Sequence, residues 1–356
     1  MPPKSLGSQL KSVVIPENKP RTEPLWKGPE VDGITFSMLS RFLVCPERFR
    51  LRVIEGLKTV DEFNPKIEYG QLWHTCEEAH AKKVPWEQPL QDYCKKLCLK
   101  YRNQQEGVLH WYNICLKQFP VYVDYWSKHK DVIERQPLEQ EKVFDVLYQL
   151  PSGRKVRIRG KRDSVDLIGK GKSAAVYLQE NKTKGQINEQ QITRQLTFDL
   201  QTMMYLTVLE YEKPYVQRIG GVRYNVIRRD CPIRRHKATK NKPEEEPVDF
   251  YNRLENDYFL ANPEEWFMRW RVEVLPQDIR RFRKECLDPI LERLGQWYDE
   301  VTEEGDPFTA TGIHYRHPFG VYNSLNEGGS SDLDEYLMTG SEVGLQRVDS
   351  LFGELT

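Results

Sequence analysis

The chain has 356 residues, 38% of them hydrophobic, which is enough to bury the core of one large domain or two modest ones. Lysine and arginine number 53, and aspartate and glutamate also number 53, so only local charge can indicate a polyanionic partner. The sequence contains no run of about eighteen apolar residues and no apolar N-terminal signal, so we expect a folded cytoplasmic protein without membrane contact.

The cysteines favour reduced thiols over a disulfide framework, because they are an odd number, seven, in a large chain. Cys94 and Cys98 share one face of a predicted helix. A zinc site needs two further ligands, and the nearby sequence offers none. We therefore expect the cysteines to pack in the interior.

Both ends of the chain are predicted to be tails. Residues 1–30 are rich in proline, lysine, serine and glutamate, a composition that buries little apolar surface. Residues 324–356 combine a Gly-Gly-Ser-Ser run with many acids, and we expect an acidic disordered tail. Within it, residues 351–355 are an apolar cluster that either docks on a partner or is simply a chain end. Residues 31–323 are the predicted folded domain.

The first part of this domain is predicted to be helical. Thr35 or Ser37 can cap a first helix, which carries apolar residues at helical spacing and ends near Pro46. Aromatic-rich helical patterns follow over 66–83 and 90–130. These helices form an N-terminal layer before any strand is predicted.

Short β-forming runs come next, with turn signals at 151–153 and 169–171. The predicted strands of this meander cover 141–150, 155–159, 164–168 and 174–179. A helix over 194–211, a strand over 221–228 and further helix over 246–303 complete the pattern. The fold class is therefore α/β or α+β, with a central mixed sheet between an N-terminal helical layer and C-terminal helices.

Two acids and a lysine fall within the meander. Side chains alternate along a strand, so Glu180 and Lys182 share one face while Asn181 points the other way. Asp163 lies on the preceding strand, and strand pairing brings its carboxylate next to Glu180. Two carboxylates this close favour a bound divalent cation. The lysine would orient or deprotonate an attacking water, or neutralise charge on a phosphate. A surface ion pair between Glu180 and Lys182 is the ordinary alternative.

His74 is a candidate metal ligand in the helical layer. Glu78 follows it by four residues and shares its helix face, so this carboxylate is a candidate to orient the imidazole. His80 lies six residues away on the opposite side, which excludes a His-Glu-x-x-His zinc helix. The alternative is that His74 is simply packed or solvated.

Gln201 and Tyr205 are also four residues apart on one helix face. Both can reach toward the strand of Lys182 or toward a substrate. The alternative is that they only decorate the helix.

Four motifs occur in a fixed order: Gly-x-x-x-His at 70–74, Gly-x-x-Asp at 160–163, Glu-x-Lys at 180–182 and Gln-x-x-x-Tyr at 201–205. In this order and spacing they resemble the PD-(D/E)xK nucleases, and within them the RecB-type branch with its CRISPR-associated and phage exonucleases. The segment 36–49 also looks like the opening helix of that branch. The likeness covers about residues 34–230.

This resemblance implies a restriction-endonuclease-like core. It also implies four metal ligands, namely His74, Asp163, Glu180 and the backbone carbonyl of Asn181. Lys182 would be the catalytic lysine, acting with Asp163 and Glu180. Gln201 and Tyr205 would position DNA or the lysine. A histidine among hard oxygen ligands favours Mn²⁺, whereas cellular abundance favours Mg²⁺.

Many members of this branch hold a four-iron cluster on one cysteine of the opening motif and three near the C-terminus. Cys45 matches the first of these, but residues 307–322 contain no cysteine. Four thiolates cannot assemble there, so we expect no iron–sulfur cluster.

Basic residues crowd the segment after the predicted strand 221–228. The candidates for DNA contact are Arg228, Arg229, Arg234, Arg235 and Lys237. They would form a mobile arm on the DNA backbone. The glutamates at 244–246 are the alternative, because they could pair with the basic residues internally.

The resemblance therefore implies a metal-dependent DNA exonuclease that acts on single-stranded DNA or duplex ends, in DNA recombination, repair or phage DNA processing. Its location would be the cytoplasm of a bacterium or of a phage-infected host. A structure-specific endonuclease would use the same ligands. A non-catalytic recombination adaptor of the same fold would be expected to lack a ligand or the lysine. The acidic tail would bind a single-strand-binding or annealing protein.

Overall fold

The computed structural model describes residues 23–44, 46–59, 63–129, 135–212, 215, 218–240, 243–303 and 344–355. These residues group into two compact units. The larger unit consists of the described parts of 28–40, 61–300 and 352–356. The smaller unit consists of the described parts of 1–27, 41–60 and 301–351.

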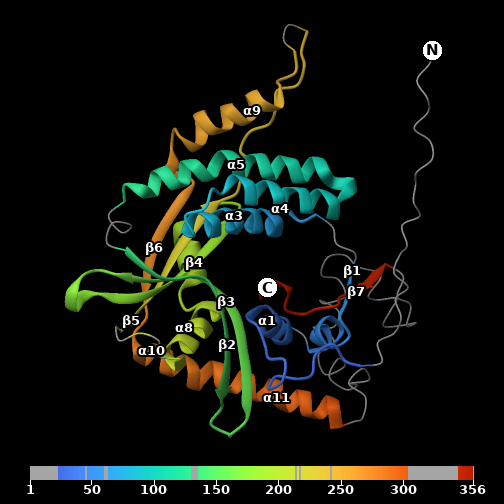
Figure 1. The fold of residues 1–356 in the computed structure, drawn as a ribbon, viewed down its shortest axis with the longest axis vertical. Helices are drawn as coiled ribbons and strands as arrows, with labels where there is room; N and C mark the ends of the chain where they lie inside the picture. Colours follow the sequence, from blue (N-terminus) through green and yellow to red (C-terminus); the bar gives the residue numbers. More distant parts are fainter. Residues whose placement is uncertain are drawn as a thin grey trace. The chain divides into compact units, whose positions relative to one another are not determined.

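The larger unit is built on a five-stranded mixed sheet in the order β2-β3-β4-β5-β6 (Figure 1). Its strands are β2 (Arg135–Gln149), β3 (Lys155–Ile168), β4 (Ala175–Lys184), β5 (Ile219–Arg228) and β6 (Phe267–Glu273). Neighbours are antiparallel except β4 and β5, which are parallel and therefore need a long connection between them. Helices supply that connection, and the predicted mixed sheet between helices is confirmed.

The helical layer lies over one face of the sheet (Figure 1). It contains α3 (Pro65–Ala81), α4 (Glu87–Lys100), α5 (Gln105–Ser127) and α9 (Pro247–Leu254). Trp73 of α3 contacts Phe119 and Tyr122 of α5 edge-on, with ring centroids 5.2 and 5.1 Å apart. The same indole lies 6.5 Å from the ring of Phe267 on β6. These buried rings join the layer to the sheet.

The helices on the other side of the sheet follow β4 and β6. They are α7 (Glu189–Leu196), α8 (Leu200–Glu212), α10 (Pro276–Phe282) and α11 (Asp288–Glu303). The single helix predicted over 194–211 is divided into α7 and α8. Phe198 between them has a left-handed φ of +56°. Asp199 then caps α8 by accepting a hydrogen bond from the N–H of Thr202 at 3.3 Å.

β3 is one strand where two were predicted, and it continues through Gly160. A Cβ atom on Gly160 would lie 2.6 Å from the ring of Phe144 and 2.9 Å from the hydroxyl of Tyr205. Glycine therefore lets both rings approach the strand closely.

The prediction of helix throughout 246–303 is wrong, because β6 lies within it. Met268, Trp270 and Val272 alternate with polar residues, which is the strand period. Pairing with β5 satisfies the backbone of this segment.

The smaller unit contains α2 (Pro46–Phe49) and an antiparallel pair of strands, β1 (Leu57–Thr59) and β7 (Leu345–Arg347). α1 (Phe36–Val44) contributes residues to both units. Trp26 is buried and packs edge-on against Phe49 at 5.1 Å. Trp26 and β7 fall within the two predicted tails, so each tail contains packed residues. The rest of those tails, residues 1–22 and 324–343, lies outside the described residues.

The described cysteines are all free thiols, namely Cys76, Cys94, Cys98, Cys115, Cys231 and Cys286. Cys45 and the segment 307–322 lie outside the described residues. Within the described part of the chain, no helix is long and apolar enough to cross a membrane.

Candidate active site

β2 and β3 place two acids side by side. Their register pairs Gln140 with Ser164 and Lys142 with Arg162, so Glu141 lies opposite Asp163. Glu141 has a left-handed φ of +47°, a conformation that non-glycine residues adopt rarely and that is enriched at functional sites. Asp163 was a predicted site residue, whereas Glu141 was missed.

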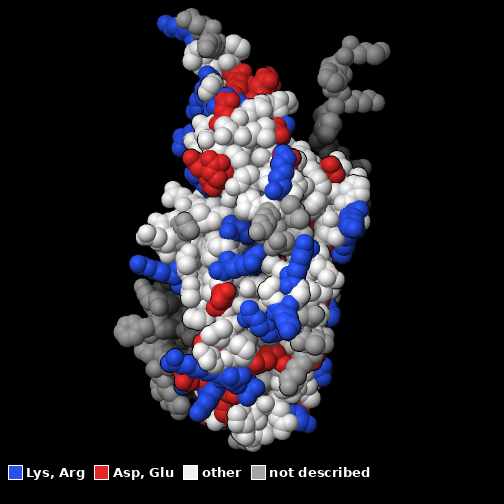
Figure 2. Space-filling model, turned by 90° about the vertical axis from the view of Figure 1, so that its left-hand side faces the viewer, with Lys and Arg blue, Asp and Glu red and all other residues white. Residues whose placement is uncertain are grey.

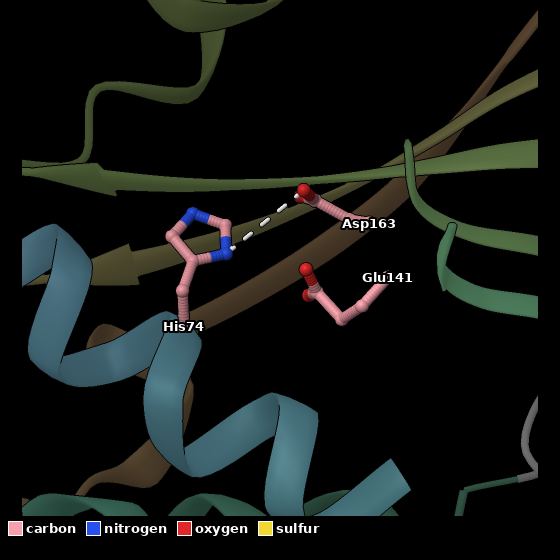
Figure 3. A group of neighbouring side chains, drawn as sticks. All are labelled: His74, Glu141 and Asp163. Carbon is pink, nitrogen blue, oxygen red and sulfur yellow. Dashed lines mark ion pairs between the residues drawn. The ribbon is translucent and has the colours of Figure 1, made fainter. Parts of the chain in front are cut away.

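His74 of α3 completes a three-residue cluster with these acids (Figure 3). Its Nδ1 atom lies 3.9 Å from Oδ1 of Asp163. One ligand atom from each of His74, Glu141 and Asp163 lies within 4.8 Å of the other two. The imidazole points from the helix toward both carboxylates (Figure 3). A nitrogen and two carboxylate oxygens are a donor set that suits Mn²⁺ or Mg²⁺.

Glu180 and Lys182 lie on one face of β4, as predicted from strand alternation. Nζ of Lys182 donates a hydrogen bond of 2.6 Å to Oε1 of Glu180 and one of 2.8 Å to Oε1 of Gln201 on α8. Glu180 is buried. The ammonium group is therefore held between a carboxylate and an amide oxygen, and the predicted reach of Gln201 toward the strand of Lys182 is present.

Asn181 links this strand to the cluster through its backbone. Its N–H donates a hydrogen bond of 2.8 Å to Oδ2 of Asp163, which leaves Oδ1 directed toward His74. Its side chain lies on the other face and donates to Oε2 of Glu77 at 2.9 Å while accepting from Asn225 at 2.9 Å. These contacts fix the strand end that carries Glu180 and Lys182. Metal ligation by the Asn181 carbonyl stays a prediction.

The cluster holds more negative charge than its surroundings accommodate. Burial raises the pKa of Asp163 well above its ordinary value, and the nearby Glu180 carboxylate raises it further. Burial, followed by the charge of Asp163, raises the pKa of Glu141 to about 7, although Lys161 opposes the shift. Both carboxylates would be relieved by a bound cation.

The charge state of Lys182 follows from two opposing effects. Burial lowers the pKa of the amine, but the adjacent Glu180 carboxylate raises it by more, so the pKa lies above its ordinary value. In this arrangement Lys182 is protonated. It supplies a positive charge rather than a base.

Glu78 was predicted to orient His74. Its carboxylate instead forms ion pairs with Lys82 on the same helix and with Lys161 of β3, the latter at 3.3 Å. Nζ of Lys161 also lies 2.9 Å from Oε2 of Glu141. Glu78 therefore acts on the cluster through the lysine that neutralises Glu141.

Tyr205 lies on α8 one turn after Gln201 and close to β3. Its ring packs edge-on against Phe144 at 5.1 Å. Its hydroxyl occupies the space that the missing side chain of Gly160 leaves open. The predicted pair on α8 is thus brought to the site, with Gln201 on the lysine and Tyr205 against β3.

Two cavities flank the acidic pair. One, of about 250 Å³, is lined by residues that include His74, Lys161, Gln201, Tyr205 and Leu355. The other, of about 420 Å³, lies on the side of α5 and β6. Glu141 and Asp163 line both cavities. A substrate in either one would therefore contact the acids of the cluster.

The predicted basic arm lies partly against the protein. The guanidinium of Arg228 lies 4.6 Å from the ring centroid of Trp266, and Arg228 pairs with Asp230 at 3.1 Å. Arg229 is half-buried, and burial lowers its pKa. Arg235 pairs with Glu244, as the internal-pairing alternative proposed.

Arg234 and Lys237 differ from their neighbours because their side chains are exposed. The loop that carries them projects beyond α9 (Figure 1). On the face drawn in Figure 2, basic side chains extend over the middle of the molecule with acidic ones between them. Charge is mixed along this face rather than gathered into one basic patch.

Comparison with known proteins places this site in a family. A family model described as the PD-(D/E)XK nuclease superfamily matches residues 34–267, about two thirds of the chain. The match includes the whole constellation from α3 to α8. No curated protein matches the chain. Members of such a superfamily act on nucleic acids, and the length of the match makes the assignment firm: the chain belongs to the PD-(D/E)XK nuclease superfamily.

Proposed function

We propose that the protein is a divalent-metal-dependent DNA exonuclease that hydrolyses phosphodiester bonds. One observation carries this proposal. The cluster of His74, Glu141 and Asp163 lies beside a buried Glu180–Lys182 pair, and the backbone of Asn181 joins the two. A cation site next to a fixed ammonium group suits a reaction at a phosphate.

The donor set supports Mg²⁺ or Mn²⁺ at this cluster. The ligand atoms already converge, and the raised pKa values of Glu141 and Asp163 reflect a missing counter-charge. Glu180 and the carbonyl of Asn181 are proposed as further ligands. The histidine favours Mn²⁺, and availability favours Mg²⁺. When bound, the cation would polarise a phosphoryl oxygen and lower the pKa of a coordinated water.

Lys182 would stabilise the charge that develops on the phosphate. Its ammonium group is protonated because Glu180 lies 2.6 Å away. Gln201 fixes the same nitrogen from α8 at 2.8 Å. A fixed positive charge needs no reorganisation when the phosphate gains charge, which is the most effective form of electrostatic catalysis.

Tyr205 and the exposed basic side chains are proposed to hold DNA. Tyr205 lines the cavity that also contains His74 and Gln201. Arg234 and Lys237 would contact backbone phosphates, because exposed cations on a projecting loop can reach a polyanion. Arg228, Arg229 and Arg235 would contribute less than predicted, since each has a partner within the protein.

The likeness to the RecB-type branch supports an exonuclease in DNA recombination, repair or phage DNA processing in the cytoplasm. A structure-specific endonuclease remains the alternative, because it would use the same residues. A recombination adaptor is less favoured because the lysine and the metal-ligand candidates are all in place.

A single-strand-binding or annealing protein remains the proposed partner of the acidic C-terminal segment. The apolar end of that segment also contacts the nuclease unit. The guanidinium of Arg159 lies 4.3 Å from the ring centroid of Phe352, and Leu355 lines the smaller cavity. A pull-down with and without residues 324–356 tests the partner proposal.

The proposed activity is tested by digestion of end-labelled single-stranded and duplex DNA with Mg²⁺, Mn²⁺ or EDTA, beside circular DNA. We expect metal-dependent loss of linear DNA from its ends and intact circles. Cleavage of circles would identify an endonuclease. Failure to cleave any DNA with either metal would contradict the proposed function.

A further inference from the structure

We infer that the larger cavity beside the cluster is a binding site for one nucleotide of the substrate strand, with the phosphate on its far side held by basic residues. The inference deepens the proposed function and rests on it. It concerns the cavity of about 420 Å³ between α3, α5 and the sheet, which we call the side pocket. Its volume lies within the range of about 300–1,000 Å³ that small-molecule sites occupy.

The side pocket begins at the metal-ligand candidates. Glu141 and Asp163 form part of its wall, so a group in the pocket is continuous with a phosphate at the cluster. Phosphates alternate with nucleosides along a strand. A phosphate at the cluster therefore places a nucleoside in one of the two flanking cavities, and the side pocket is the larger of them.

The charge of the wall changes from acidic to basic with distance from the cluster. Along the α3 side, the lining proceeds from Glu77 through His80 to Lys83. Lys83 comes nine residues after His74, roughly 13 Å further along the helix direction at about 1.5 Å per residue. Along β2 the lining proceeds from Glu141 to Arg135. Both walls thus end in a cation, which suits a second phosphate beyond the nucleoside.

An aromatic surface lies between these two ends. Tyr122 and Trp126 of α5 line the pocket, and the guanidinium of Arg269 on β6 lies 4.0 Å from the ring centroid of Trp126. Nη2 of Arg269 donates a hydrogen bond of 3.1 Å to the hydroxyl of Tyr122. Aromatic rings and arginine planes are the surfaces on which unpaired bases stack without regard to sequence. The aromatic wall therefore suits the base and the basic end suits the phosphate.

The pocket also defines which form of substrate enters it. Its walls come from the helical layer and the sheet of one unit, and α5 closes the side opposite the strands. A base pair is wider than a single base, so the pocket accepts an unpaired nucleotide. The proposal therefore predicts a substrate strand that is single-stranded at the point of cleavage.

Thymidine 3′,5′-bisphosphate is a suitable probe, because it carries a phosphate on each side of one nucleoside. Its binding to the full chain is measured by calorimetry with Ca²⁺, beside thymidine as the ligand without phosphates. We expect the bisphosphate to bind at least tenfold more tightly than thymidine, because only the bisphosphate reaches both charged ends. Equal affinities would overturn the inference.

Lys83 supplies the decisive variant, and its neighbour supplies the control. Lys83 and Lys82 are both exposed, and only Lys83 lines the pocket. Lys83→Gln is expected to weaken bisphosphate binding about three- to tenfold, whereas Lys82→Gln leaves it unchanged. Equal effects of the two substitutions would overturn the inference. A second variant, Trp126→Ala, is expected to weaken binding of both ligands, provided that circular dichroism shows a folded protein.

These outcomes separate the pocket from the proposed activity. Metal-dependent cleavage with no difference between Lys83→Gln and Lys82→Gln would remove the pocket and leave the nuclease. Bisphosphate binding that depends on Lys83, without cleavage of any DNA, would support the pocket and remove the proposed hydrolysis.

Discussion

Glu141 lies opposite Asp163 across the β2–β3 pair, and both carboxylates face the imidazole of His74. This relationship makes Glu141 part of the cation site, although it belongs to none of the four sequence motifs. The acids are brought together by strand register, and the histidine is added by a helix that precedes them by about seventy residues.

Replacement of Glu141 is expected to weaken the metal site. Glu141→Ala removes one of three converging ligands, so the concentration of Mn²⁺ needed for half-maximal cleavage should rise at least about tenfold. A metal titration of cleavage measures this change. Asp145→Asn is the matched control, because Asp145 lies on the same strand and pairs with Arg157 and Arg159 away from the cluster. An unchanged metal requirement in Glu141→Ala would exclude ligation by this residue.

Loss of the lysine is expected to abolish cleavage and spare DNA binding. Lys182→Ala removes the only ammonium group that contacts Glu180 among the described residues, so the rate should fall by about 100- to 1,000-fold. Lys184→Ala is the control on the same strand and face. Single-turnover rates and DNA affinity are measured for both variants. Retained cleavage in Lys182→Ala would contradict the assigned role.

Gln201 is expected to act through the lysine. Gln201→Ala removes the 2.8 Å hydrogen bond to Nζ of Lys182 and leaves Glu180 as its partner. The cleavage rate should fall about tenfold with little change in DNA affinity, whereas a substrate-binding role would mainly change the affinity. Gln201→Glu keeps an acceptor at this position and should restore part of the rate.

The stability of the metal-free protein should depend on the charge of Glu141. Its pKa is about 7 in the folded chain, against 4.5 as the ordinary value. The folded state therefore holds the proton more tightly, and the stability that this provides is complete below about pH 4.5 and is lost as pH rises through 7. Glu141→Gln should raise the free energy of unfolding by about 1 kcal/mol at pH 8 and hardly at all at pH 5. Thermal unfolding in EDTA at both pH values tests the sign.

Much of the site followed from short patterns in the sequence, because strand alternation and helix spacing are local properties. Glu180 and Lys182 share a strand face, and Gln201 reaches the lysine from the next helix. Glu141 was missed because its role depends on pairing with a distant residue. The turn at 151–153 contained that information, since counting back from it along both strands places Glu141 opposite Asp163.

The remaining errors arose where tertiary contacts decide the structure. β6 has a clear alternating pattern, but its pairing with β5 spans a long and mostly helical connection. Arg228, Arg229 and Arg235 looked like a basic arm because sequence shows charge without its partners. Trp266, Trp111 and Glu244 supply those partners in the folded chain.

The exposed cations that remain on this loop give the last prediction. Arg234 and Lys237 are exposed, whereas the neighbouring Arg235 pairs with Glu244. If the exposed pair contacts phosphates, Arg234→Gln with Lys237→Gln should lower DNA affinity and reduce the slope of log affinity against log salt by about 0.9 for each lost contact on duplex DNA. Arg235→Gln should change that slope less, because its charge is already neutralised. DNA titrations between low and moderate salt measure all three variants. An unchanged slope in the double variant would assign the loop to the protein's own packing, since binding that releases no counterions involves no phosphate contact there.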